Sequence, residues 1–469
     1  MYLQISSSGA VVVPNVIGGD VVSLPESQNF PVIQGSTGNA IHCAQSATVD
    51  VGIKAVETAA EVFKTWRKTP LSRRRAVLNK AADILETKAE ELAKREISET
   101  SCDPHWPEFG VTYASKFVRE TSANVSTVHG SIPDSEVSGT TSLVFREPVG
   151  VVLTVIPWNA PIILACRGIA AALAAGCTLV LEVFTEEGLP AGALNKIQCS
   201  RADGPAVTEA IISHLALRKV EFIGSAAVGR IIGSIAGRHL KPVLMELGDQ
   251  SPVIILEDAD LKAAAENCVR GTVAHHGQIC FGTERIIVHQ KVAQEFIQLL
   301  VEATEAVPST GHAITIEAAK RAHEEAVADD AKYLVGTAKY TGRTSLEPSI
   351  LTDVRSKSRL SHEESFALSA TLYVVNSDEE ALVLANNTPY GLSASVFTRN
   401  HAKGLAVARD LEFGQVQINS HTMSVNGRSL TVNEVSAAQT GFKGSGWGSN
   451  GAAYGIGEFL FSKHVSLTL

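Results

Sequence analysis

The chain has 469 residues, of which 45% are hydrophobic and 19% charged, and its formal net charge is −9. This length exceeds what a single hydrophobic core usually supports, so two or three domains are expected. The net negative charge argues against a nucleic-acid partner. The one basic cluster, Arg73–Arg75, lies in a helical stretch, where we expect a solvated helix face.

The seven cysteines are an odd number and form no C-x-x-C pair, which argues against a disulfide framework and against a thiolate zinc site. A reducing compartment fits this pattern. The N-terminus lacks the basic-then-apolar plan of a signal peptide, so a cytoplasmic protein is expected. The most apolar region, residues 149–181, is interrupted by Pro157, Pro161 and Arg167 and predicts no membrane span. The adjacent His275 and His276 do not indicate a metal site.

Helical patterns occupy the first hundred residues. One shows apolar residues at a spacing of three to four, namely Val51, Ala55, Ala59, Phe63 and Trp66. A second follows Leu71 and runs through Leu92. A third helix is expected over residues 111–128, and the alternation within residues 131–149 predicts a β-hairpin.

From residue 149 onward, short apolar strands alternate with helices. Strands are predicted at 150–155, 178–181, 219–223 and 242–245, with helices at 163–175, 206–216 and 227–237. A second series begins at 251–256 and continues with strands near 284–289 and 370–375. Such alternation builds a parallel sheet covered by helices on both faces, so the predicted class is α/β.

Cys280 is a candidate nucleophile. It stands between Gly277 and Gly282, just before a strand-like run at residues 285–289. A catalytic thiol needs access and a turn that presents its sulfur, and flanking glycines permit such a turn. The local pattern also fits a buried structural cysteine, so other stretches of the sequence are needed to decide between a catalytic and a structural role.

Two polar residues follow predicted strands. Asn159 lies beyond the carboxyl end of strand 150–155, where open α/β sheets bind ligands. Its amide is suited to stabilise an oxyanion, or equally to cap the following helix. Glu246 ends the apolar strand 242–245 and is a candidate general base, or else a structural partner of Lys241 or Lys262.

A glycine turn at Gly224–Gly229 lies between a strand and a helix. Free backbone N–H groups and the positive end of the helix can receive a pyrophosphate there. Many strand-to-helix turns use glycine without binding a phosphate, so this turn alone indicates little.

Together these stretches resemble the aldehyde dehydrogenase superfamily, whose motifs occur here in the same order over residues 15–469. They are P-W-N-A at 157–160, F-x-G-S-x-x-V-G at 222–229, E-L-G at 246–248, G-Q-x-C-x-x-x-x-R at 277–285, E-x-F at 364–366, N-T-P-Y-G-L-S-A at 387–394 and K-G-S-G-W-G at 443–448. Within the family, residues 240–246 and 283–288 look most like the branch that oxidises aromatic aldehydes such as vanillin, benzaldehyde or salicylaldehyde.

The resemblance implies a role for each candidate residue. Cys280 would attack the aldehyde to form a thiohemiacetal, and Asn159 would stabilise its oxyanion. Hydride would pass to NAD or NADP and leave a thioester, and Glu246 would activate the water that releases the acid. Further residues are expected to bind the cofactor, and they are Pro157, Trp158, Gly224, Ser225, Gly229, Leu247, Glu364 and Phe366.

The resemblance also implies an aldehyde dehydrogenase-like α/β fold in three parts. A Rossmann-type parallel-sheet cofactor domain would comprise residues 15–130 and 148–245, with 421–454 returning to it. An α/β catalytic domain would comprise 246–420, and a small β oligomerisation arm 131–147 and 455–469. The tail from Glu458 to Val465 looks like an apolar edge strand, so a homodimer or homotetramer is expected, with no nucleic-acid or membrane partner.

The cofactor side departs from the family pattern. After strand 178–181 the family continues with K-P-S-E and a full helix, whereas here Leu181-Glu182 is followed within a few residues by Gly188-Leu189-Pro190. The missing segment would carry a lysine that binds the adenosine ribose. We therefore expect weakened cofactor binding and apolar strand surface that is exposed or covered by a neighbour. Asp249 in place of a glycine would add negative charge near the nicotinamide.

These departures leave two functions besides aldehyde oxidation. The chain would then be a cofactor-impaired family member that acts as a non-redox thiol enzyme, or a non-catalytic partner in an oligomer.

Overall fold

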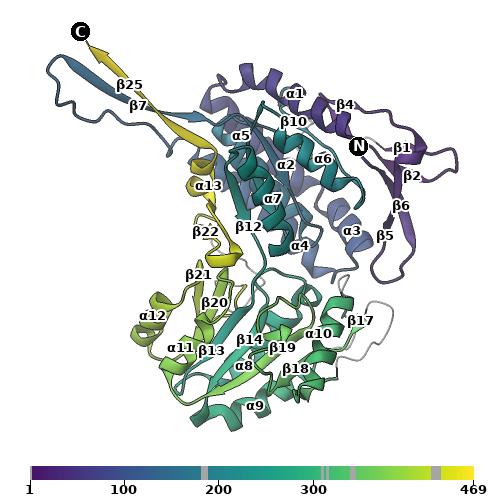
Figure 1. The fold of residues 1–469 in the computed structure, drawn as a ribbon, viewed down its shortest axis with the longest axis vertical. Coiled ribbons are helices and arrows are strands. Elements are labelled where there is room, and N and C mark those ends of the chain that lie inside the picture. The colour runs from purple at the N-terminus through teal and green to yellow at the C-terminus, as the bar shows by residue number, and fades with distance from the viewer. Residues whose placement is uncertain are drawn as a thin grey trace.

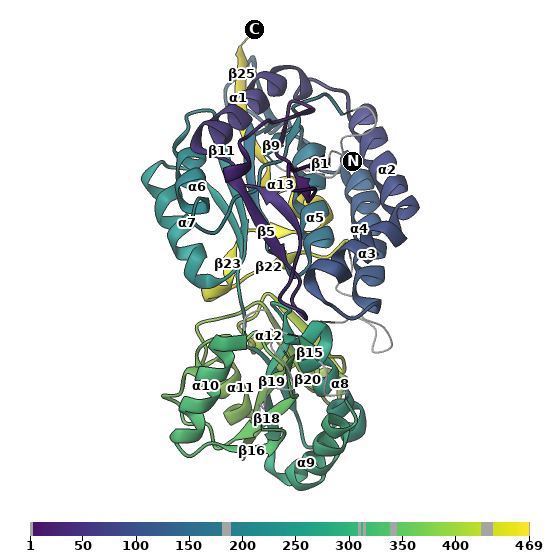
Figure 2. The same ribbon diagram turned by 90° about the vertical axis from the view of Figure 1, so that its right-hand side faces the viewer.

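The computed structural model describes residues 3–180, 189–307, 311–312, 316–337, 345–423 and 435–468. Figure 1 shows two parallel-sheet bodies, one above the other, with a two-stranded arm projecting from the upper body. Figure 2 shows the same arrangement from the side, with the N-terminal strands lying along the upper body. Among the described residues, no helix is both long and apolar enough to cross a membrane.

The upper body contains a six-stranded sheet in the order β10-β9-β8-β11-β12-β23. Its strands are β8 (Val151–Val155), β9 (Thr178–Val180), β10 (Leu194–Asn195), β11 (Leu217–Ile223), β12 (Val243–Glu246) and β23 (Gly446–Trp447). All neighbours run parallel except β12 and β23. Most of the strands are rich in apolar residues because helices bury both faces of the sheet, although β11 also carries Arg218, Lys219 and Glu221.

Two helical layers cover this sheet. One layer comprises α2 (Leu71–Thr87), α4 (His105–Asn124), α5 (Pro161–Ala175) and α13 (Ala452–Glu458), and the other comprises α1 (Val49–Trp66), α6 (Gly204–Ser213) and α7 (Ala226–Arg238). Helix α5 lies directly behind the predicted site. It starts with Pro161 at its first position and ends at Gly176 in the left-handed conformation, which are favourable residues for those two positions.

Several helices have boundaries other than those predicted. The second helical pattern is two helices, α2 and α3 (Ala89–Thr100), which meet at Lys88. The third helix starts earlier than predicted, at His105, and ends at Asn124. The expectation of a solvated face at Arg73–Arg75 is wrong for Arg74, which is buried and donates to the carbonyl oxygens of Ala174 and Ala175 at the end of α5.

The lower body contains a seven-stranded sheet in the order β16-β18-β19-β14-β13-β20-β21, parallel except between β16 and β18. Its strands are β13 (Ser251–Ile255), β14 (Thr283–His289), β16 (Lys332–Val335), β18 (Ser349–Thr352), β19 (Ser369–Val375), β20 (Ser393–Phe397) and β21 (Gln415–Ile418). Helices α8 (Leu261–Val273) and α9 (Gln290–Glu305) cover one face, and α11 (Asp378–Asn386) and α12 (His401–Asp410) cover the other. Helix α10 (Ile316–Ala328) packs beside β18.

The arm is formed by β7 (Thr140–Pro148) and β25 (Leu460–Thr468), which pair antiparallel along their whole length. The predicted hairpin over 131–149 is therefore wrong, because the partner of β7 is the C-terminal strand and only Ser131 bridges back to Val144. The C-terminal strand also begins later than predicted, since α13 includes Glu458.

A four-stranded sheet at the N-terminus was not predicted. It has the order β1-β2-β6-β5, with β1 (Gln4–Ile5), β2 (Val11–Val13), β5 (Asn29–Ile33) and β6 (Ala40–Gln45).

The link between β9 and β10 includes the place where the family helix was predicted to be missing. Residues 181–188 lie outside the described residues, and residues 189–193 contain no helix. Both strands are buried, and the side chain of Thr178 donates to the carbonyl oxygen of Ala59 in α1. The expectation of exposed strand surface is therefore wrong for β9 and β10, which α1 and the N-terminal residues of the same chain cover.

Candidate active site

A cavity of about 330 Å³ lies where the two sheets meet. The upper sheet contributes the turns that follow β8, β11 and β12, at the carboxyl ends of parallel strands. The lower sheet contributes the turns that precede β14 and β19. The lining residues are Pro157, Trp158, Asn159, Leu164, Ile223, Gly224, Ser225, Glu246, Leu247, Gly248, Cys280, Ala318, Glu364, Ser365 and Phe366. Every predicted site residue except Gly229 is therefore gathered here.

Cys280 stands in the turn between the short helix η2 (Ala274–Gly277) and β14. Gly277 has φ +76°, and a Cβ at this position would lie 2.1 Å from the carbonyl oxygen of Ala367. His275 and His276 are also left-handed, with φ +46° and +59°. This strained turn separates Cys280 from the helix and places it at the cavity, as was predicted from the flanking glycines.

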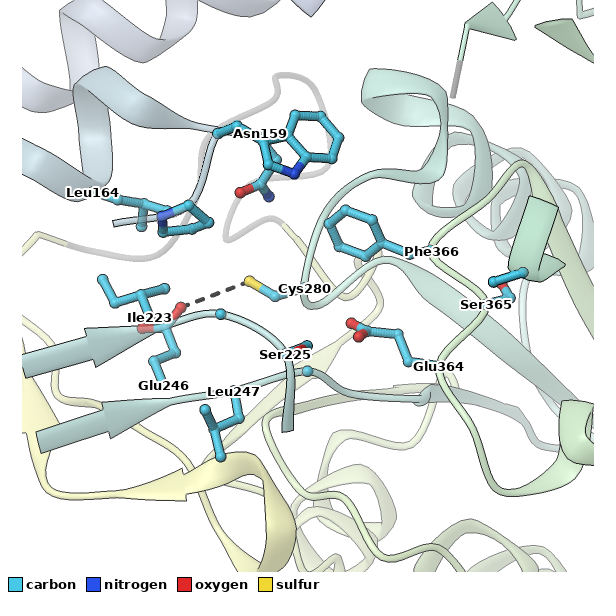
Figure 3. A pocket seen from close by; sticks show the side chains of 15 residues that line it. Asn159, Leu164, Ile223, Ser225, Glu246, Leu247, Cys280, Glu364, Ser365 and Phe366 are labelled. Carbon is cyan, nitrogen blue, oxygen red and sulfur yellow. Dashed lines mark hydrogen bonds between the residues drawn. The ribbon is translucent and has the colours of Figure 1, made fainter. Parts of the chain in front are cut away.

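Cys280 faces Glu246 across the cavity. Its Sγ lies 3.6 Å from Glu246 Oε1, within hydrogen-bonding distance for sulfur (Figure 3). Burial raises the pKa of the Cys280 thiol well above its ordinary value, and the carboxylates of Glu246 and Glu364 add to the effect. The resting group is therefore a thiol, and Glu246 is placed to accept its proton.

The other cysteines lie outside the cavity lining. Burial raises the pKa of Cys166 to about 12 and that of Cys177 to about 11, and it raises the pKa of Cys268 as well. These three thiols are packed inside the cores of the two bodies. Among the described cysteines, only Cys280 lines the cavity and has a carboxylate beside its sulfur.

Asn159 reaches over the same turn. Its amide nitrogen donates to the carbonyl oxygen of Gln278 at 2.9 Å, and its side chain is 6% exposed. It does not cap α5, whose N-cap is Ala160 with no side-chain hydrogen bond. An amide nitrogen carries two hydrogens, so the second remains available to an oxygen bound next to Cys280.

Glu246 ends β12, and its side chain is buried. Its Oε2 lies 2.5 Å from Nη2 of Arg167, which comes from α5. The proposed structural partners are wrong, since Lys241 donates to the carbonyl oxygens of His214 and Leu217, and Lys262 is exposed. The sequence did not identify Arg167 as part of the site. The only hint was a cation within the most apolar stretch of the chain.

The turn after β11 fits a dinucleotide phosphate. Gly224 and Ser225 line the cavity directly before α7, whose first residue is Ala226. The Ser225 hydroxyl accepts from the Val228 N–H at 3.4 Å and so caps the helix, whose first residue follows this lining turn directly. Gly229 lies behind, where a Cβ would come within 2.6 Å of Leu247, so its role is to let α7 pack closely.

Glu364 and Phe366 form the opposite wall. Glu364 accepts from the Asp249 N–H at 3.2 Å, and burial raises its pKa well above the ordinary value. The Phe366 ring meets Trp158 edge to face, with ring centroids 6.1 Å apart. A carboxylate such as Glu364 is suited to bind ribose hydroxyls, and the aromatic rings of Phe366 and Trp158 are suited to contact a flat nicotinamide ring.

Glu284 holds this wall in place, and the sequence did not single it out. Its carboxylate accepts from the N–H groups of Ser365 and Phe366, the latter having φ +50°. Burial raises the pKa of Glu284 to about 7. Its position within the cysteine motif was the available clue.

The expected effect of Asp249 is wrong. Its side chain is 1% exposed and turned away from the cavity, where it accepts from the Ser251 hydroxyl and from the N–H groups of Leu392 and Ser393. The carboxylate links the start of β13 to the start of β20. It therefore places no charge beside a bound nicotinamide.

An apolar cluster adjoins the cavity. It comprises Cys102, Trp106, Ala160, Leu164, Ile223, Ile279 and Met423. The His275 ring stacks on Trp106 with centroids 4.6 Å apart, and burial lowers the pKa of His275 to about 3. His275 is thus a neutral packing residue, and no group of three or more metal-ligating side chains occurs among the described residues.

Comparison with known proteins agrees with this geometry. The model of the aldehyde dehydrogenase family matches residues 23–465. A vanillin dehydrogenase from Pseudomonas fluorescens is 34% identical over 97% of this chain and 98% of its own length. The crystal structure of a salicylaldehyde dehydrogenase from Pseudomonas putida G7, complexed with salicylaldehyde, superposes with a TM-score of 0.92 at 31% identity, covering 98% of each chain. A betaine aldehyde dehydrogenase from Staphylococcus aureus in complex with NAD+ gives 0.90 at 26% identity, over 97% of this chain and 94% of its own. On its sequence and its fold, this chain belongs to the aldehyde dehydrogenase family.

Proposed function

We propose that the chain oxidises a hydrophobic, aromatic aldehyde to the carboxylic acid, with NAD or NADP as the acceptor. The observation that carries the proposal is the contact between the Cys280 thiol and the Glu246 carboxylate inside a cavity that Asn159 also lines. A nucleophile, a base and an oxyanion donor thereby surround one space.

The chain's own residues account for the acyl chemistry. Cys280 loses its proton to Glu246 and attacks the carbonyl carbon, and the Asn159 amide donates to the oxygen that becomes negative. Trp158, Leu247, Glu364 and Phe366 would hold the nicotinamide, which would supply the hydride acceptor when bound. Loss of hydride from the adduct leaves the acyl group on Cys280 as a thioester. Glu246 releases the thiol proton to solvent and then takes a proton from the water that releases the acid.

The substrate class is argued from the lining. Among the described residues that line the cavity there is no lysine or arginine, and Trp158, Leu164, Ile223 and Phe366 supply apolar surface. An anionic aldehyde would find no counter-charge there, whereas an aromatic ring would be packed on several sides. The names of the vanillin and salicylaldehyde dehydrogenases that resemble this chain support the same class.

Steady-state oxidation of paired aldehydes tests the proposal. With NAD or NADP in excess, kcat/KM for benzaldehyde and vanillin should exceed that for succinate semialdehyde, an anionic aliphatic aldehyde, by at least about tenfold, which corresponds to about 1.4 kcal/mol. Equal values, or a preference for the anionic aldehyde, would contradict the aromatic assignment.

The alternative is a cofactor-impaired thiol enzyme or a non-catalytic oligomeric partner. The short link between β9 and β10 favours it, because none of the described residues there contributes a helix or a lysine to a bound adenosine. Hydrolysis of an activated ester at Cys280 without any nicotinamide-dependent oxidation would support the first of these functions. Absence of both activities would support the second.

A further inference from the structure

Arg167 is a buried cation that the proposed reaction does not use. It lies on α5, is 3% exposed, and contacts the Glu246 carboxylate at 2.5 Å. Its other terminal nitrogen, Nη1, donates to Gln439 Oε1 at 2.7 Å. The contact with Glu246 is an ion pair, and the hydrogen bond from Nη1 to Gln439 restricts how far the guanidinium can turn away from it.

The two oxygens of Glu246 have different partners. Oε2 faces Arg167, while Oε1 faces the Cys280 sulfur at 3.6 Å. Binding of one oxygen by Arg167 therefore directs the other oxygen at the thiol. In Figure 3 the dashed line from Cys280 ends on this second oxygen.

A second buried carboxyl lies near Arg167. Glu221, on β11, is fully buried, and its Oε2 accepts from the Thr154 hydroxyl at 3.3 Å, whereas its Oε1 has no hydrogen-bond partner. It packs against the residue that follows Arg167, since a Cβ on Gly168 would lie 2.1 Å from Glu221 Oε2. Burial raises the pKa of Glu221 to about 7, so below that pH it carries a proton and leaves the charge of Arg167 to Glu246.

We infer that Arg167 is a positioning residue that holds the Glu246 carboxylate in place and directs it at Cys280. Burial alone disfavours the charge of Arg167, but Glu246 and Glu221 outweigh this and raise the pKa of Arg167. An opposite charge within about 4–6 Å typically moves a carboxyl titration by about 1–3 pH units in favour of the carboxylate. The ionisable groups that surround this pair are Tyr113 on α4, Lys219 and Glu221 on β11, Cys280 before β14, and Glu364 before β19.

The inference rests on the proposed role of Glu246, so its test uses a reaction that needs no nicotinamide. Cys280 attacks p-nitrophenyl benzoate, p-nitrophenolate leaves, and the benzoyl group stays on the sulfur as a thioester. Glu246 takes the thiol proton in the first step and passes it to solvent. Water then hydrolyses the thioester while Glu246 takes a proton from the water. This second step needs the carboxylate form of Glu246, so its rate falls at low pH, and this fall is the acidic limb of the pH profile.

Removing the cation should move that limb. In Arg167→Met we expect the midpoint of the acidic limb to rise by at least about one pH unit, because the charge that favours the carboxylate is gone. In Arg167→Lys, which keeps a charge without the planar fork, the midpoint should lie between those of wild type and Arg167→Met. The Lys variant also keeps the test open if the Met variant does not fold.

Two variants serve as matched controls. Arg74→Met removes another buried arginine, at the opposite end of α5, and should leave the midpoint within about 0.3 pH units of wild type, well below the effect of a direct charge contact. Glu221→Gln imitates the protonated carboxyl and should also leave it unmoved. An unmoved limb in both Arg167 variants, or a larger displacement in Glu221→Gln than in Arg167→Met, would overturn the inference. Aldehyde oxidation is measured separately, so its absence would contradict the proposed function without changing this result.

Discussion

Cys280 differs from the other buried cysteines in its surroundings. Its sulfur faces a carboxylate and a cavity, whereas Cys166 and Cys268 face only apolar side chains of the two cores. The difference depends on a strained turn in which His275, His276 and Gly277 all have positive φ. Strain of this kind persists only where the surrounding structure enforces it, and here the backbone of Ala367 and Leu368 lies against Gly277.

Two glycine substitutions test the turn. Gly277→Ala should destabilise the protein by more than about 1 kcal/mol, because it combines a positive φ with a clash against Ala367, and oxidation should fall as Cys280 moves. Gly237→Ala is the matched control. It lies in α7 with no atom within 4 Å of its Cβ, and it should stabilise by roughly 0.5–1 kcal/mol. Urea midpoints measure both changes, and a tolerated Gly277→Ala would show that the turn is not constrained.

The pH dependence of stability should report on Glu221. Its pKa rises from 4.5 to about 7 in the folded protein, so the folded state binds a proton more tightly than the unfolded chain. Stability is therefore lost as pH rises from 4.5 to 7. Glu221→Gln should stabilise by at most about 3 kcal/mol at pH 8 and by nothing at pH 4, because a tenfold change in proton affinity corresponds to about 1.4 kcal/mol. A difference of equal size at both pH values would show that the carboxyl does not titrate in this range.

At the residue scale, the sequence identified the groups whose types and order form a motif. Cys280, Glu246 and Asn159 meet at one cavity as expected. Arg167, Glu221 and Glu284 were missed, because a charged residue inside an apolar stretch does not reveal which charge faces it across the fold. The direction of the Asp249 side chain was also beyond the sequence, since it depends on contacts with β20.

At the element scale, we expect the turn before α7 to strengthen cofactor binding and the link between β9 and β10 to weaken it. The first residue of α7 directly follows this turn, which lines the cavity, and a helix start of this kind favours a pyrophosphate. None of the described residues of the link between β9 and β10, which are residues 189–193, forms a helix beside the sheet. We therefore expect a cofactor held at its pyrophosphate and nicotinamide ends but weakly at its adenosine.

Calorimetry with NAD and NADP tests this expectation. Loss of one charge-assisted hydrogen bond, worth roughly 1.5–3 kcal/mol, should weaken binding by about ten- to a hundredfold relative to family members that have the lysine. The S. aureus betaine aldehyde dehydrogenase, which has been crystallised with NAD+, is a suitable reference measured in parallel. Equal affinities would mean that another residue of this chain replaces the lysine.

Strands and helices of the parallel sheets were predictable because burial on both faces gives continuous apolar runs of a length typical for strands. Helices α5 and α7 start within two residues of their predicted positions. For the arm, the two grounds of prediction differed. The resemblance placed residues 131–147 and 455–469 in one small β arm, whereas local alternation suggested a hairpin within 131–149. Strand β7 pairs with β25, more than three hundred residues away, which local alternation does not reveal.

At the scale of the whole molecule, the arm is a ribbon with exposed apolar side chains on it, including Phe145, Phe461, Val465 and Leu467. An isolated two-stranded ribbon is marginally stable in water, and its outer edges leave backbone groups unpaired. In Figure 1 the arm extends away from both bodies. We propose that a second copy of the chain covers it, in a homodimer or homotetramer.

Light scattering at micromolar concentration tests this proposal. We expect a dimer or a tetramer, and truncation after Phe459, which removes β25, should yield smaller or aggregated species because β7 loses its partner. A full-length chain that scatters as a monomer would contradict the proposal. The sequence indicated an exposed edge strand here, and the apolar side chains on β25 are exposed.

We propose that this chain oxidises aldehydes through Cys280. The most direct measurement mixes a stoichiometric excess of NAD or NADP with the protein and benzaldehyde, and follows the absorbance of the reduced nicotinamide through the first turnover. Wild type should give a burst. Glu246→Gln should give a slower burst and lose most of the steady rate, because Glu246 takes both the thiol proton and the proton of the water, and Cys280→Ser should give neither. A burst that survives in Cys280→Ser, or no reduction by wild type with either cofactor, would contradict the account.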